Sequence, residues 1–150
     1  MPPDIQPGGA SEKKKWTVMV FMGADTMAGN ASLIKPAVAD LEEMRFVGSG
    51  CRLKSYVQVH LGKDDAPRRG EITTDMRPGI DALKEVAAEG GNPARGHGLE
   101  CFILDSLKQS CYDPFNHDHH TMLVLWGHAY DFAIGRAHTT NGTVDALDFA

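Results

Sequence analysis

The chain has 150 residues, of which 42% are hydrophobic and 23% charged, and its formal net charge is −5. This length and apolar content are enough for one hydrophobic core, in a whole domain or in a piece of a larger one, and they argue against a disordered chain. The acidic balance argues against nonspecific nucleic-acid binding, and no apolar run approaches the roughly 20 residues that cross a bilayer.

We expect residues 1–14 to form a flexible N-terminal segment and residues 15–150 to form the folded part. The segment is rich in Pro, Gly, Ser and Lys, a composition that does not favour packing. It lacks the apolar core of a secretory signal, so the localisation is unknown, with the cytoplasm as the default.

Three segments predict the buried strands of a parallel sheet: the apolar runs Trp16–Met22 and Thr121–Trp126, and the stretch Leu53–Leu61, in which alternate residues share one face. Between the first two, residues 34–47 predict a helix with Pro36 in its first turn. Its apolar residues recur at intervals of three and are expected on the buried face: Val38, Leu41, Met44 and Val47.

The remaining segments predict shorter or irregular elements. In chain order we expect a loop or small β-excursion (Gly62–Asp75), weak helix (Pro78–Ala88), a loop (Glu89–Gly98), a helix (Leu99–Cys111), turns (Tyr112–His120) and the start of another helix (Gly142–Ala150). Strands joined by helical crossovers predict an α/β fold, a parallel sheet with helices on both faces.

Chemistry in such sheets lies at the carboxyl ends of the strands. Here those ends are Gly23-Ala24-Asp25, His60-Leu61-Gly62 and Gly127-His128-Ala129. His128 is the side chain best placed for catalysis, because an imidazole there could act as a general base near neutral pH. On position alone, a structural histidine that ends a strand is the favoured explanation. No glycine-rich phosphate-binding motif is present.

Several blocks of the sequence resemble the clostripain family of cysteine peptidases. The residues from Lys14 to Asp25 (KKWTVMVFMGAD) are similar to the family's opening strand and turn, and Ala39–Met44 (ADLEEM) to its first helix. Val57–Val59 continues the match in the second strand, and Arg68-Arg69-Gly70 stands where the family often carries arginines. Leu123–His128 (LVLWGH) resembles the strand that carries the catalytic histidine.

The resemblance implies a caspase-like three-layer sandwich and a His/Cys dyad that cleaves peptide or protein substrates after Arg or Lys. His128 would be the dyad histidine, and the backbone N–H of Ala129, where the family has glycine, would donate to the oxyanion. Nothing in this chain resembles the block that carries the nucleophilic cysteine and the neighbouring acidic specificity residue. We therefore expect a domain that is incomplete at its C-terminus, without cofactor and inactive as given.

The three cysteines and the pair His97-Gly98 are rivals for the catalytic positions. Cys51, Cys101 and Cys111 are expected to be reduced, small thiols that are buried or half-buried. His97-Gly98 falls in the predicted glycine-rich loop rather than after a strand, which argues against it.

Two further alternatives remain open. The chain could be a truncated, catalytically dead relative that associates with itself through an exposed sheet edge. It could also bind a metal through His117, Asp118, His119 and His120, although adjacent residues rarely converge on one ion. Asp64 and Asp65 would hold Ca²⁺ only weakly, because no EF-hand spacing is present.

Overall fold

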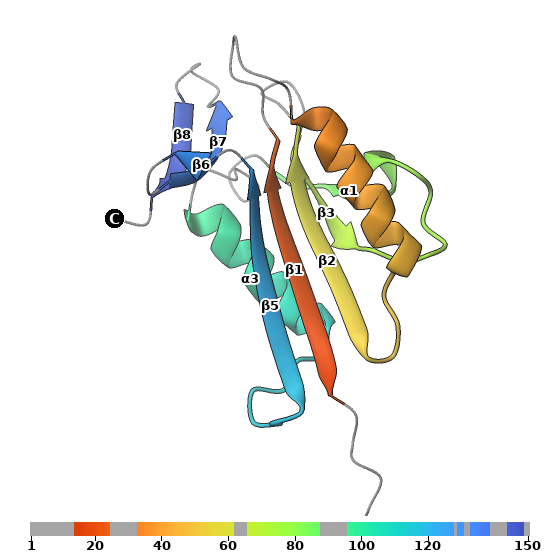
Figure 1. The fold of residues 1–150 in the computed structure, drawn as a ribbon. Coiled ribbons are helices and arrows are strands. Elements are labelled where there is room, and N and C mark those ends of the chain that lie inside the picture. Colours follow the sequence, from red (N-terminus) through yellow and green to blue (C-terminus); the bar gives the residue numbers. More distant parts are fainter. Residues whose placement is uncertain are drawn as a thin grey trace, which may run out of the picture.

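The structure is a computed structural model, and it describes residues 14–24, 33–61, 66–87, 96–127, 129–130, 133–138 and 144–148. In this part, one sheet contains β1 (Lys15–Gly23), β2 (Leu53–His60), β3 (Arg68–Glu71), β4 (Lys84–Glu85) and β5 (His119–Gly127). Its strand order is β4-β3-β2-β1-β5 (Figure 1). A second sheet contains β6 (Ala129–Tyr130), β7 (Ala133–His138) and β8 (Val144–Asp148).

The predicted α/β fold is confirmed, although the main sheet is mixed. β1 lies between β2 and β5 and is parallel to both. β3 is antiparallel to β2, and β4 to β3. The connection from β2 to β3 is too short for a parallel crossover, which needs about a dozen residues, so the chain turns back on itself.

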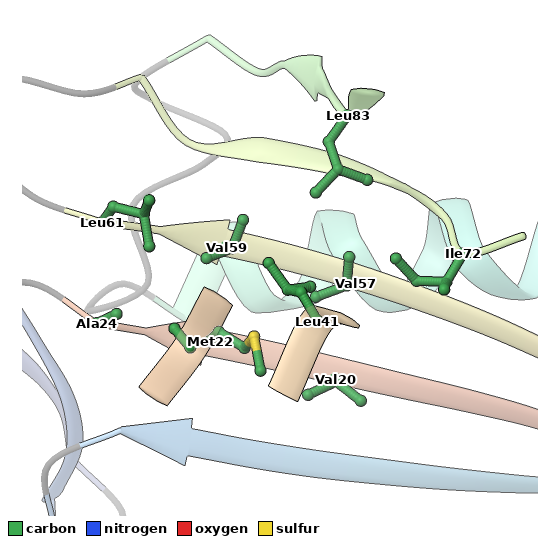
Figure 2. Close-up of a cluster of buried hydrophobic side chains, with 10 residues drawn as sticks. Val20, Met22, Ala24, Leu41, Val57, Val59, Leu61, Ile72 and Leu83 are labelled. Atoms are coloured by element: carbon green, nitrogen blue, oxygen red, sulfur yellow. The ribbon is translucent and has the colours of Figure 1, made fainter. Parts of the chain in front are cut away.

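The helix α1 (Ile34–Val47) has the predicted bounds and covers one face of the sheet. Ala37 and Leu41 are buried against the apolar residues that β1 and β2 send to that face, among them Met22 and Val59 (Figure 2). The predicted burial of Val47 is wrong, because this side chain is 66% exposed. The residues of α1 that contact the sheet are Ile34, Ala37, Leu41 and Met44, so Ala37 takes the place predicted for Val38.

A close approach fixes the end of α1. The N–H of Gly48 donates to the carbonyl of Met44 at 2.8 Å, and Gly48 has φ of 62°, a left-handed conformation that suits glycine. A Cβ on Gly48 would lie 2.6 Å from Thr74 Cγ2 and 2.7 Å from Thr74 N. The loop after β3 therefore packs directly on the helix end.

The helix α3 (Gly96–Gln109) covers the opposite face of the sheet, as Figure 1 shows. Phe102 is fully buried against Phe21 and Tyr56, with Ile103 and Leu107 partly buried beside them. The helix begins three residues before the predicted start, so the pair His97-Gly98 belongs to its first turn and not to a loop.

Three other predictions fail in the described residues. The stretch Pro78–Ala88, predicted to be weakly helical, holds only the 3-10 turn η1 (Ile80–Ala82) before β4. The predicted helix from Gly142 is the strand β8, which pairs antiparallel with β7 because β-strand pairing outweighs a short helical pattern. The predicted burial of both faces of the third strand also fails: in β5, at the edge of the described sheet, Met122 is 51% and Leu123 39% exposed.

A helix needs about 20 apolar residues to cross a bilayer. Neither α1 nor α3 is long and apolar enough to span one.

Candidate functional site

The parallel strands end side by side at one edge of the sheet. Gly23, the last residue of β1, is in register with His60 of β2 and with Gly127 of β5. The N–H of Ala24 donates to the carbonyl of His60 at 2.8 Å, which extends the ladder past the strand end. The predicted common carboxyl edge is therefore present, and the backbone reaches it immediately before residue 128.

The two residues predicted to act in catalysis follow this edge. His128 lies outside the described residues, so its role stays a prediction. The backbone of Ala129 belongs to β6, where it pairs with Ile134. Ala129 and Tyr130 form a strand of the second sheet and do not continue β5. The proposed oxyanion role of the Ala129 N–H also stays a prediction.

A side-chain hydrogen bond joins the carboxyl-terminal part of β5 to α1. Trp126 Nε1 donates to Asp40 Oδ2 at 2.7 Å, and both side chains are half-buried. Trp126 also packs on the edge of the core under α1. This bond ties β5 to α1 two residues before position 128.

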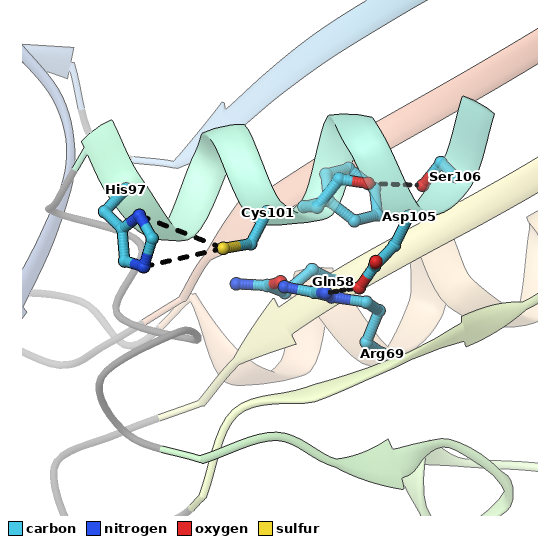
Figure 3. A network of polar contacts seen from close by, with 7 residues as sticks. Gln58, Arg69, His97, Cys101, Asp105 and Ser106 are labelled. Carbon is cyan, nitrogen blue, oxygen red and sulfur yellow. Dashed lines mark hydrogen bonds and ion pairs between the residues drawn. The ribbon is translucent and has the colours of Figure 1, made fainter. Parts of the chain in front are cut away.

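On the other face, a polar network links β2, β3 and α3. Arg69 Nε donates to Gln58 Oε1 at 2.7 Å, and its guanidinium forms an ion pair with Asp105 (Figure 3). The guanidinium carbon lies 5.7 Å from the centre of the Phe102 ring. Because Gln58 is buried and Arg69 nearly so, this network orients α3 on the sheet. The neighbouring Arg68 pairs instead with Asp81 and Glu85, so both arginines form ion pairs within the described part of the chain.

The structure brings together two residues that the sequence analysis weighed separately. Cys101 Sγ lies 3.6 Å from Nε2 and 3.9 Å from Nδ1 of His97, one turn earlier in α3 (Figure 3). The spacing of four residues would have predicted this contact had residues 96–98 been assigned to the helix. Cys101 is half-buried, as expected, whereas Cys51 and Cys111 are exposed, which corrects the prediction for both.

The histidines before the third strand do not converge. His119 and His120 are the first residues of β5, so their side chains point to opposite faces of the sheet. His119 Nδ1 accepts a hydrogen bond from the Asp113 N–H at 3.0 Å, and His120 stacks on Trp16. Among the described residues, no three His, Cys, Asp or Glu side chains are grouped to hold a metal. Asp64 and Asp65 lie outside that part of the chain.

Two acidic groups near the core have shifted pKa values. Burial raises the pKa of Tyr56 to about 12, with smaller contributions from Glu71 and Cys111. The hydrogen bond from the Gly79 N–H, 2.8 Å from Glu42 Oε1, lowers the pKa of Glu42, and Arg45 lowers it further. Neither group lies at the carboxyl edge of the strands, so these shifts concern the stability of the fold.

No protein-family model and no curated protein matches the sequence. Among solved structures, the fold is similar to that of a B. fragilis cysteine protease, with a TM-score of 0.54 and 21% identity over 79% of this chain and 92% of that chain. At this identity the similarity shows the fold alone. The chain therefore has an α/β fold of the kind found in that cysteine protease.

Proposed function

We propose that the chain is the histidine-bearing part of a clostripain-like cysteine endopeptidase that cleaves after Arg or Lys. The observation that supports this most is the common edge formed by Gly23, His60 and Gly127, because the next residue after that edge is His128. The similarity to a cysteine protease fold and the family-like blocks of sequence agree with it.

The proposed reaction uses two residues of this chain, His128 and Ala129. His128 takes the proton of a cysteine thiol, and the thiolate attacks the scissile carbonyl. The Ala129 N–H donates to the oxyanion, and His128 then gives the proton to the leaving amine, which leaves an acyl-enzyme. Water hydrolyses the acyl-enzyme. The thiol comes from a segment outside these 150 residues, since none of the cysteines present follows the family's motif.

The test is hydrolysis of fluorogenic peptides by the product of the complete gene. We expect cleavage after Arg or Lys, its loss in His128→Ala, and nearly unchanged melting temperature in that variant. His117→Ala, an exposed turn histidine, is the matched control and should keep full activity. A gene product that cleaves normally with His128→Ala refutes the assignment, as does one without any cysteine after residue 150.

The outermost strand of the sheet, β5, supports a second candidate function, association with a second copy of the chain. β5 has nine residues and no Asp, Glu, Lys or Arg, and no strand of the described part pairs with its outer side. Antiparallel pairing of two copies about Leu123 would place Met122 opposite Val124 and Thr121 opposite Leu125, without any like charges.

Sedimentation of the 150-residue chain tests this second function. We expect a dimer that Leu123→Lys converts to a monomer, whereas Phe115→Lys, at a residue that is 89% exposed outside the strand, leaves the dimer intact. A monomeric, cooperatively unfolding chain contradicts the proposal.

A further inference from the structure

A small cavity lies where the parallel strands begin, at the end of the sheet opposite to Gly127 (the lower end of the sheet in Figure 1). Its volume is about 130 Å³, which is room for several water molecules or for one phosphate group. The first residues of β1 and β2 line one side of it, and residues 110–112, which follow α3, line another. The proposed peptidase reaction does not use this end of the sheet.

The charged side chains around this cavity are basic. Lys15, Arg52 and Lys54 line it, and none of the described residues that line it is Asp or Glu. Strand pairing brings the three cations together. The N–H of Trp16 donates to the carbonyl of Arg52 at 2.7 Å, and Thr17 is in register with Lys54.

Within the described part of the chain, one of these three cations has an acidic partner. Lys54 Nζ forms an ion pair with Glu71 Oε1 at 2.9 Å. No carboxylate of the described residues pairs with Lys15 or Arg52. Three cations and a single acid around one small cavity leave a positive potential there, which favours an anion.

A buried hydroxyl faces the same cavity. Thr17 is only 6% exposed and lines the cavity. It lies on the same face of β1 as Met19 and Phe21, which pack against α3. Its hydroxyl has no hydrogen-bond partner among the residues that the structure describes. Because buried polar groups are normally hydrogen-bonded, this hydroxyl can donate to an oxygen atom of a ligand.

The end of α3 beside the cavity does not present bare carbonyls to an anion. The carbonyl of Leu107 accepts from the N–H of Tyr112 at 3.1 Å, and that of Lys108 from the N–H of Cys111 at 3.3 Å. Cys111 has φ of 53°, so the chain turns away from the helix there. These bonds satisfy the carbonyls at the negative end of the helix dipole, which would otherwise repel a negative ligand.

We propose that the cavity binds a phosphate group, free or as a monoester, through Lys15, Arg52 and Lys54 and the Thr17 hydroxyl. A guanidinium donates two parallel hydrogen bonds to phosphate, and an ammonium contributes a compact charge. Phosphate carries up to about two negative charges and offers more oxygens than a carboxylate, so it can contact several cations and a hydroxyl together. This proposal does not rest on the peptidase activity, since it uses neither His128 nor the carboxyl edge of the strands.

The three cysteines allow an internally controlled test, because Cys51 and Cys111 line the cavity and Cys101 does not. The thiols are alkylated with iodoacetamide, which is uncharged, in inorganic phosphate or in chloride of equal ionic strength, and mass spectrometry measures each site. We expect phosphate to slow alkylation of Cys51 and Cys111 about tenfold, by blocking access and disfavouring the thiolate, and to leave Cys101 unchanged. A parallel series with glycerol 3-phosphate distinguishes the sources: protection by both compounds indicates a monoester site, and protection by inorganic phosphate alone indicates free phosphate.

Variants of the cavity separate specific binding from general attraction between charges. Arg52→Gln should raise the phosphate concentration for half-protection about tenfold, and Thr17→Val about threefold. Lys14→Gln is the matched control, because it removes the same charge from a residue that does not line the cavity, and it should keep full protection. Circular dichroism checks that each variant is folded. The proposal is overturned if phosphate gives no protection, if chloride or Cys101 shows the same effect, or if Lys14→Gln weakens protection as much as Arg52→Gln.

Discussion

The hydrogen bond between Trp126 and Asp40 ties the end of β5 to α1, and a double-mutant cycle measures its strength. The variants are Trp126→Phe, Asp40→Ala and the pair together. A hydrogen bond to a charged acceptor contributes about 1.5 to 3 kcal/mol, and half-burial favours the lower end, so we expect a coupling energy of about 1.5 kcal/mol. The cycle is needed because Trp126→Phe alone also removes packing area from the core.

Urea unfolding of the four proteins provides the free energies, and an unchanged m-value shows that the unfolded states are comparable. The chain contains a second tryptophan that serves as a matched control. Trp16 stacks on His120 instead of bonding to α1, so Trp16→Phe combined with Asp40→Ala should be additive within about 0.5 kcal/mol. A coupling between Trp126 and Asp40 no larger than this control refutes the argument that the bond positions β5.

Three further predictions test the core, the helix end and the buried phenol. Phe102→Ala should lower the free energy of unfolding by about 3 to 5 kcal/mol, whereas the exposed Phe115→Ala should change it by less than about 0.5 kcal/mol in urea titrations. Gly48→Ala should cost more than about 1 kcal/mol by the same measurement, since its Cβ meets backbone at a positive φ, and Gly50→Ala, with open space around it, should cost little. Because the pKa of Tyr56 is raised to about 12 by burial, the unfolded chain loses this proton first; we expect stability to fall as the pH rises from about 10 towards 12, and Tyr56→Phe to reduce that fall.

The sequence predicted the parallel part of the sheet well, because its signals there are strong and local. Apolar runs identified β1 and β5, and alternating apolar residues identified β2, all within two residues at each end. The spacing of apolar residues gave α1 its bounds. It failed for β8, where five residues carry too little pattern to distinguish a strand from a helix. The exposure of Leu123 could not be predicted, since it depends on which strand lies at the edge.

The candidate site was predicted in part for the same reason. The alignment of the strand ends follows from parallel pairing, so the edge at Gly127 was foreseen. The contact between His97 and Cys101 was not, because glycines before Leu99 suggested a loop, and a helix start in such a segment depends on packing against the sheet.

The central position of β1 has a consequence for the order in which the chain folds. β1 pairs with β2, where Trp16 lies opposite Leu53, and with β5, where Trp16 lies opposite His120. The chain between β1 and β5 is much longer than the chain between β1 and β2, so the β1–β5 pairing closes the longer loop. During synthesis β1, α1 and β2 emerge early and can assemble while the rest of the sheet is still being translated. The β1–β5 pairing, which brings Gly127 beside Gly23, therefore forms after the β1–β2 pairing, and until then β1 offers an unpaired, apolar side to molecular chaperones.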